Sequence, residues 1–188
     1  MGIRASTLIR WLVVCVFWGG IAVAQPTEPP ADEGAGDRDP TITVFLARHA
    51  EKVRDRTVAD PPLTEAGRQR ARDLAMTLSE AGIEVVFTTQ WLRTRQTAAP
   101  TAEHLGLEAL PIEARDDFIQ QMVRRITELE GKTILVVGHS DTTPELARAL
   151  GASEAPDIAD DDFDDLYQVV ISPTDRRFVH LRYGHPTP

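Results

Sequence analysis

Two arginines and two histidines in this chain have the chemistry needed to handle a phosphoryl group. Arginine presents a planar fork of donors that matches phosphate oxygens, and it keeps its charge. A neutral imidazole can attack phosphorus near neutral pH, because its ordinary pKa is about 6.5. A second histidine, once protonated, can donate to a phosphate oxygen in the transition state. The residues of these types that stand beside apolar segments are Arg48, His49, Arg93 and His139.

Each of these residues is a weak signal when it is taken alone. An Arg-His pair arises by chance in about one chain in five of this length. A histidine that follows a buried strand is often a structural residue, and an arginine at a helix start is often a solvated surface group. Their joint significance therefore depends on the elements that position them.

Apolar and β-branched runs alternate with segments of helical spacing along most of the chain. The alternation predicts an α/β fold, a three-layer α/β/α sandwich with a mostly parallel sheet. The predicted strands are 41–47, 83–88, 107–112, 132–138 and a closing pair at 166–172 and 177–183. The predicted helices lie between Thr64 and Gly82 and at 91–105, 118–129 and 143–150, with Pro100 as a potential kink.

Three of the predicted strands run directly into the candidate residues. The first ends at Arg48 and His49, another ends shortly before Arg93, and the strand 132–138 ends at His139. Ligands of such sheets bind beyond the carboxyl ends of the strands, which lie at one edge. We therefore expect the two arginines and two histidines to meet in one pocket.

Four segments in this order resemble the histidine phosphatase superfamily, the phosphoglycerate mutase-like group. They are LARHAE at 46–51, with Ala50 where the family has glycine, PLTEAG at 62–67, FTTQWLRTRQTA at 87–98 and VVGHS at 136–140. The resemblance implies a metal-independent phosphatase without a cofactor. It implies that His49 is the phosphorylated nucleophile and that Arg48, Arg93 and His139 bind the phosphoryl group.

The chain departs from this family at the proton donor. Many members carry a glutamate after the Gln-Thr-Ala block, and Gln120 stands near that place here. The alternatives for a general acid are Asp141, Glu113 and Asp117, with Asp116 beside them. Without an acid, the enzyme would favour good leaving groups such as phosphohistidine or an acyl phosphate. The insertions that family mutases carry over the site are absent, which favours a phosphatase over a mutase.

Lys52, Arg54 and Ser140 lie close in sequence to the predicted histidines and are candidate substrate-binding residues. Lys52 and Arg54 would line the mouth of the pocket and attract anions, although a solvated loop explains them equally well. The segment 157–165 contains six aspartates, and Asp160 begins an alternation of them that is typical of a calcium loop. Because the glycine and the glutamate of such a loop are missing, we expect an acidic surface loop.

The first 24 residues have the layout of a signal peptide. Arg4 and Arg10 precede and flank an apolar run, and Ala22-Val23-Ala24 is a small-x-small cleavage site. We expect cleavage after Ala24 and a periplasmic or secreted protein; an uncleaved N-terminal anchor is the alternative. Residues 25–40 are rich in Pro, Gly and acids, which predicts a disordered linker before a domain at 41–188.

Composition limits the partners of this domain. The formal net charge is −9, and loss of residues 1–24 removes two arginines, which makes it −11. Such a protein repels nucleic acid and anionic membranes, so we expect neither as a partner of the mature form. The same loss removes Cys15, the only cysteine of the chain, which is compatible with an oxidising compartment.

The sequence thus predicts an exported phosphatase that acts on a small-molecule or protein-borne phosphate through a phosphohistidine on His49. One alternative is a non-catalytic module of the same fold that binds phosphate. Another is a structural envelope domain with an accidental Arg-His pair, which four ordered motifs disfavour.

Overall fold

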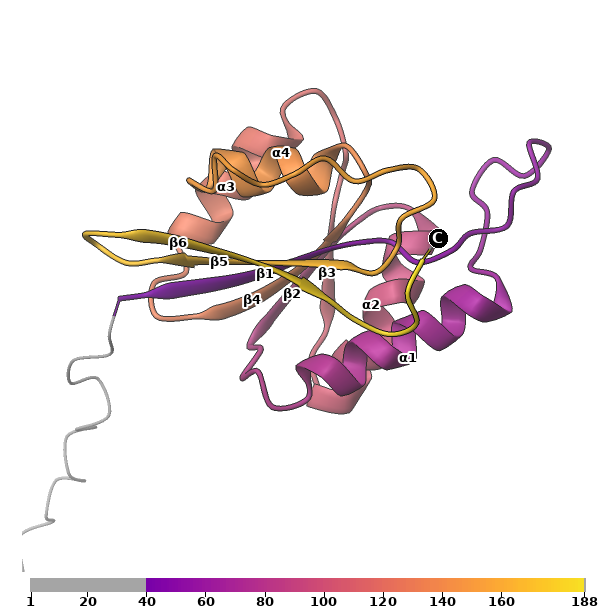
Figure 1. Cartoon of the computed structure of the whole chain (residues 1–188), viewed down its shortest axis with the longest axis horizontal. Coiled ribbons are helices and arrows are strands. Elements are labelled where there is room, and N and C mark those ends of the chain that lie inside the picture. Colours follow the sequence, from indigo (N-terminus) through magenta and orange to yellow (C-terminus); the bar gives the residue numbers. More distant parts are fainter. Residues whose placement is uncertain (1–39, 188) are drawn as a thin grey trace, which may run out of the picture. The chain divides into compact units, whose positions relative to one another are not determined.

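The computed structural model describes residues 40–187 (Figure 1). The predicted signal peptide, residues 1–24, and all but the last residue of the predicted linker lie outside this part. The elements are β1 (Ile42–Arg48), α1 (Glu65–Leu78), β2 (Val85–Thr89), α2 (Leu92–Leu105), β3 (Ala109–Ile112), α3 (Phe118–Thr127), β4 (Thr133–Gly138), α4 (Thr142–Ala149), β5 (Asp165–Ile171) and β6 (Arg176–Arg182). Each predicted strand and helix is present, with small shifts at its ends.

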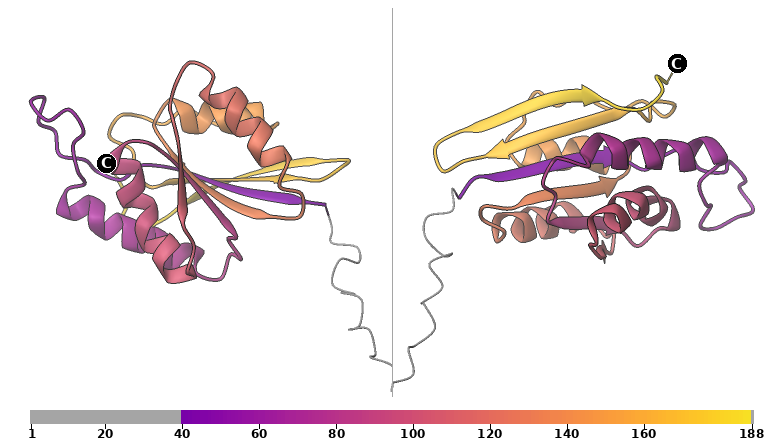
Figure 2. Two further views of the ribbon diagram at one scale, coloured as in Figure 1. Left: turned by 180° about the vertical axis from the view of Figure 1, so that it is seen from behind. Right: turned by 90° about the horizontal axis from the view of Figure 1, so that it is seen from below.

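The six strands form one sheet in the order β3-β2-β4-β1-β5-β6. The pairs β1–β4, β4–β2 and β2–β3 are parallel, whereas β5 is antiparallel to both of its neighbours, β1 and β6. Figure 2 shows helices on both sides of this sheet. The predicted α/β/α sandwich with a mostly parallel sheet is confirmed.

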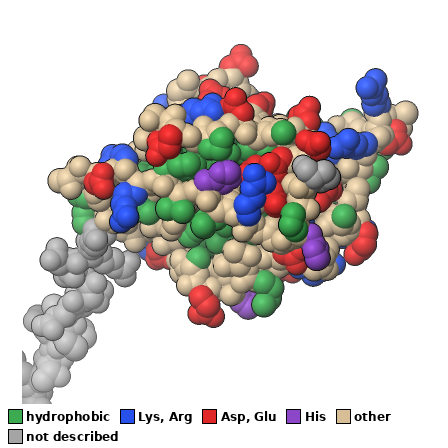
Figure 3. Space-filling model, viewed as in Figure 1, with side chains coloured by type: hydrophobic (Ala, Val, Ile, Leu, Met, Phe, Trp, Pro, Cys, Tyr) green, Lys and Arg blue, Asp and Glu red, His purple; other side chains and the backbone are tan. Residues whose placement is uncertain are grey.

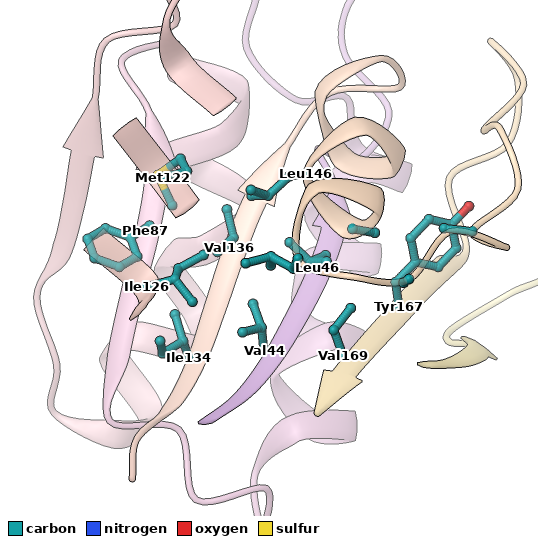
Figure 4. Close-up of a cluster of buried hydrophobic side chains, with 14 of the residues drawn as sticks. Val44, Leu46, Phe87, Met122, Ile126, Ile134, Val136, Leu146, Tyr167 and Val169 are labelled. Atoms are coloured by element: carbon teal, nitrogen blue, oxygen red, sulfur yellow. The ribbon is translucent and has the colours of Figure 1, made fainter. Parts of the chain in front are cut away.

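Alternate residues of the central strand β1 enter two different cores, as the period of a β-strand requires. Val44 and Leu46 join the core under α3 and α4, where Figure 4 shows them beside Val136 and Leu146. Phe45 and Ala47 lie in the opposite core, which α1 and α2 cover. Because both faces of β1 are buried, its register is set on both sides and its last residues are held in place.

Local signals explain where two of the helices begin and end. Thr64 caps α1, because its hydroxyl accepts the N–H of Gly67 at 3.0 Å. The helix α2 continues through Pro100, and Gly106 ends it with a φ of 66°, which glycine tolerates. Among residues 40–187, no helix has the length and apolar composition needed to cross a bilayer.

Candidate active site

His49 directly follows β1 and is held by a hydrogen bond that extends the sheet. Its N–H donates to the carbonyl of Gly138 at 2.9 Å. Its ring Nδ1 lies 2.8 Å from the carbonyl of Ala50, and a carbonyl only accepts, so Nδ1 carries the proton. The lone pair therefore resides on Nε2. The side chain is buried, with 4% of the residue exposed.

Burial above all, together with the nearby charges of His139, Arg48 and Arg93, lowers the pKa of His49 to about 3, against the hydrogen bond to Ala50. The imidazole is therefore neutral across the whole range near neutral pH. A neutral ring with its lone pair on Nε2 is the form that attacks an electrophile.

His139 follows β4, and its ring lies 5.4 Å from that of His49, edge to face. Its Nδ1 is 3.5 Å from a guanidinium nitrogen of Arg93, which can only donate, so Nε2 bears the proton. Nε2 then donates to the hydroxyl of Thr89 at 3.1 Å, and Thr89 donates to Thr94 at 2.9 Å. The hydroxyl of Thr94 in turn donates to the Trp91 carbonyl at 2.8 Å, so each group in this series donates to the next.

Burial, helped by the positive charge of Arg93, lowers the pKa of His139 to about 4, and Asp141 opposes the shift. Both histidines are therefore neutral in the free protein. An anion bound between them would favour the protonated form of His139 and so gain a charged donor.

Arg93 lies in the first turn of α2, where a carboxylate holds both the helix and the guanidinium. Asp60 accepts the N–H of Leu92 with both oxygens at 3.0 Å and lies 3.8 Å from Arg93. The guanidinium also lies 5.2 Å from the ring centre of Trp91. Sequence reasoning missed Asp60, because its distance of 32 residues from Leu92 leaves no local signal.

Arg48 is also buried, and backbone carbonyls surround its guanidinium. The carbonyl oxygens of Ala159, Asp160 and Asp162 accept from it at 2.7, 3.0 and 2.8 Å, and the ring of Phe163 lies 4.2 Å away. Its Nε has no partner among the described residues. Burial lowers the pKa of Arg48, against the attraction of nearby aspartates.

The loop 157–165 therefore supplies the hydrogen-bond partners of Arg48. Asp164 and Asp165 are buried, with 4% and 2% exposed, so the predicted acidic surface loop is wrong for these two residues. The physical reason is that basic side chains contact both carboxylates: Arg182 lies 2.5 Å from Asp164 and 3.4 Å from Asp165, and His180 lies 2.5 Å from Asp165. In residues 40–187, no group of three or more His, Cys, Asp or Glu side chains is arranged to hold a metal ion.

The segments that follow His49 are tied to α1 and α2. Thr97 accepts the N–H of Ala50 at 3.0 Å and donates to the carbonyl of Arg93 at 2.8 Å. Gln96 accepts the N–H of Leu63 at 2.8 Å. These contacts couple the loop after β1 to the helix that carries Arg93.

A second set of contacts joins Glu51, in the segment after His49, to α1. Glu51 forms an ion pair with the buried Arg70, with Nε of Arg70 at 2.9 and 3.0 Å from its two oxygens. A Cβ at Gly67 would lie 2.2 Å from the carbonyl oxygen of Glu51, so only glycine allows α1 this close approach.

A cleft of about 1170 Å³ opens at this edge of the sheet. Its walls include six cationic side chains and four carboxylates, a local positive excess in an acidic chain. The cations are Arg48, Lys52, Arg54, Arg56, Arg93 and Arg115, and the carboxylates are Asp55, Asp116, Asp141 and Asp160.

The sequence is similar to those of known proteins. Residues 44–122 match the family model described as histidine phosphatase superfamily (branch 1). The chain is 38% identical over 74 residues to a Serratia proteamaculans protein named probable phosphoglycerate mutase GpmB, and 34% identical over 74 residues to phosphoserine phosphatase 1 of Hydrogenobacter thermophilus. Each match covers 37% of this chain and about a third of the relative's length, 34% and 35%.

The fold extends this similarity over most of the chain. The structure of the protein histidine phosphatase SixA complexed with tungstate aligns with a TM-score of 0.63 and 20% identity, and the alignment covers 74% of this chain and 96% of SixA. Residues 44–122 thus resemble the histidine phosphatase superfamily, and the described part of the chain shares the fold of SixA. The predicted resemblance is thereby confirmed.

In this histidine phosphatase fold, most of the predicted site residues gather around one cleft. Arg48, His49, Arg93 and His139 all line it. So do the predicted substrate-binding residues Lys52, Arg54 and Ser140.

The candidate acids separate in space. Asp141 and Asp116 line the cleft, whereas Glu113 and Asp117 are not among its lining residues. Gln120 is exposed on α3 and also lies outside the cleft lining.

We expect the buried, neutral His49 to weaken folding at acid pH. Between its folded pKa of about 3 and its ordinary value of 6.5, the unfolded state binds the proton and the folded state does not. The free energy of unfolding therefore rises with pH across this window. At pH 4.5 the loss from this residue, relative to pH 7.5, is about 3 kcal/mol.

Urea unfolding of the wild type and of His49→Asn at both pH values measures the contribution of His49 to the free energy of unfolding. The wild type should lose 2–3 kcal/mol more than the variant, roughly as the linkage relation requires. Equal losses in the two proteins would contradict the neutral state of buried His49.

Proposed function

We propose that this protein is a phosphatase that transfers a phosphoryl group to Nε2 of His49 and then to water. The observation that carries the proposal is the hydrogen bond from Nδ1 of His49 to the Ala50 carbonyl, which leaves the Nε2 lone pair free at a cationic cleft. The named activities of the phosphoserine phosphatase and of SixA support the same chemistry.

In the first step, Nε2 of His49 forms a bond to phosphorus while the bond from phosphorus to the leaving group breaks. Arg93 and Nε of Arg48 supply positive charge and donors to the non-bridging oxygens. His139, protonated when the anion binds, donates to another oxygen. In the second step, water attacks phosphorus, the N–P bond breaks, and inorganic phosphate leaves with neutral His49 restored.

A phosphomonoester or phosphoamino acid is the proposed substrate class. The leaving group needs a proton unless it is a weak base. Asp141 and Asp116 are the candidate acids that line the cleft, and Asp141 stands two residues after His139 and acts on its charge. We therefore assign Asp141 as the proton donor. Asp141 is also the N-cap residue of α4, because one of its carboxylate oxygens accepts the N–H of Thr142 at 2.7 Å.

The pattern in residues 1–24 supports a further proposal, that the phosphatase acts outside the cytoplasm after cleavage behind Ala24. Those residues lie outside the described part. The chain that remains after this cleavage is acidic and would repel nucleic acid and anionic membranes, which supports a substrate other than these.

The purified full chain should hydrolyse p-nitrophenyl phosphate with EDTA present, and vanadate should inhibit it as an analogue of the in-line transition state. His49→Ala should reduce turnover by at least about a thousandfold, the scale expected on loss of a covalent nucleophile. Acid-labile phosphate on the wild type, trapped by rapid quench, checks the intermediate.

Turnover that survives His49→Ala would rule out the nucleophile. A wild type that turns nothing over, yet is stabilised thermally by phosphate, would favour the phosphate-binding module. His104→Ala, at an exposed position on α2 outside the cleft lining, is a matched control that should keep full turnover.

The assignment of Asp141 is tested by leaving groups of different basicity. Asp141→Asn should lower kcat for an alkyl phosphate such as glycerol phosphate about a hundredfold, and that for p-nitrophenyl phosphate less than threefold. Asparagine still caps α4, so folding should be preserved. Asp116→Asn is the control on the same cleft; an equal loss with both substrates in Asp141→Asn would refute the donor role.

A further inference from the structure

Three cations on one loop of the cleft have no carboxylate partner. They are Lys52, Arg54 and Arg56, on the segment 52–63 that connects β1 to α1, here named the 52–63 loop. None of the three forms an ion pair with a carboxylate of residues 40–187. In a chain with 29 acids and 20 Lys and Arg residues, unpaired cations gathered on one wall are not explained by composition.

These cations also repel one another and the phosphoryl-binding arginines. Burial lowers the pKa of Lys52, and Arg93, Arg48 and Arg54 lower it further. Arg54 acts on Arg48 in the same direction. Like charges held together cost free energy, and a bound anion removes that cost.

The 52–63 loop is structured rather than a loose surface segment. Lys52 pairs with Leu63 in an antiparallel bridge, and the N–H of Val53 donates to the Pro62 carbonyl at 2.9 Å. Asp55 accepts from the N–H and the hydroxyl of Thr57 at 2.9 and 2.7 Å. These contacts order the backbone that carries the three cations before a ligand arrives, which reduces the entropic cost of binding.

We propose that the 52–63 loop forms an anion subsite, so that the preferred substrate carries a second anionic group beside the phosphoryl group that it loses. The subsite rests on the proposed phosphatase and narrows its substrate class. The second anion belongs either to a small molecule or to acidic residues around a phosphorylated side chain, and the chemistry of recognition is the same.

Two matched substrate pairs test the subsite and separate these sources. The first pair is phenyl phosphate and 4-carboxyphenyl phosphate, and the second is a phosphotyrosyl peptide flanked by Gln or by Glu. The wild type should prefer the more anionic member of at least one pair about tenfold in kcat/KM. The double variant Arg54→Gln/Arg56→Gln should abolish that preference.

The control is Arg124→Gln/Arg125→Gln, which removes the same charge from exposed positions on α3 outside the cleft lining and should keep the preference. A preference in the first pair assigns a small molecule, and one in the second pair alone assigns a protein. No preference in the wild type, or the same preference in the Arg54/Arg56 variant, overturns the subsite. Calorimetric binding of the first pair to His49→Ala tests the subsite without turnover, so its failure and that of the phosphatase are distinguishable.

A second inference comes from the far edge of the sheet, where Arg182 ends β6. Its guanidinium lies 3.0 Å from Asp162, 2.5 Å from Asp164 and 3.4 Å from Asp165. The hydroxyl of Thr187 donates to this cluster as well, at 2.8 Å from Asp162. Figure 3 shows basic, acidic and histidine side chains adjacent on this face.

The same loop 157–165 presents the carbonyls that hold Arg48, including that of Asp162. Asp162 thus contacts Arg182 through its carboxylate and Arg48 through its carbonyl, and Phe163 beside it stacks on Arg48. We infer that Arg182 is a positioning residue, which fixes Arg48 for phosphate through this loop.

A double-mutant cycle tests this coupling. Arg182→Gln should raise the Ki of vanadate about tenfold, Arg182→Lys should restore much of the loss, and Arg177→Gln, exposed on the same strand, should change nothing. In the background of Arg48→Gln, Arg182→Gln should raise the Ki no further, because its effect passes through Arg48. Additive effects, or a lower melting temperature with an unchanged Ki, would reduce Arg182 to a structural role.

Discussion

The backbone hydrogen bond from the N–H of His49 to the Gly138 carbonyl extends the pairing of β1 and β4 by one residue beyond the strand. Parallel strands end at one edge of their sheet, so this pairing sets the rings of His49 and His139 5.4 Å apart. His49 is buried at this position, which lowers its pKa and keeps the ring neutral. The rest of the cleft is built around this pair of strand ends.

Several residues of the recognised motifs support the backbone rather than face a ligand. Thr97 accepts the N–H of Ala50, and Gln96 accepts that of Leu63, so hydrogen bonds join α2 to the loop after β1. Gly67 permits α1 to contact the carbonyl of Glu51. The motif spacing therefore reflects a network of hydrogen bonds as much as a set of chemical groups.

Arg48 shows how a buried charge is retained in a chain of net charge −9. Three carbonyls and an aromatic ring replace water around its guanidinium, because a buried charge without partners would be too costly. The loop that supplies them carries buried aspartates, which in turn require Arg182. The pairing of buried charges thus links β1, which leads into His49, to the edge strand β6.

The sequence by itself determined the order of strands and helices, the sandwich fold and the meeting of Arg48, His49, Arg93 and His139. These features follow from hydrophobic periodicity and from the rule that parallel strands end together, and both are encoded locally. Only the tertiary structure decided which candidate acids line the cleft, and which groups hold the two arginines. The partners of Arg48 lie 111–114 residues away, and such contacts leave no local pattern in a single sequence.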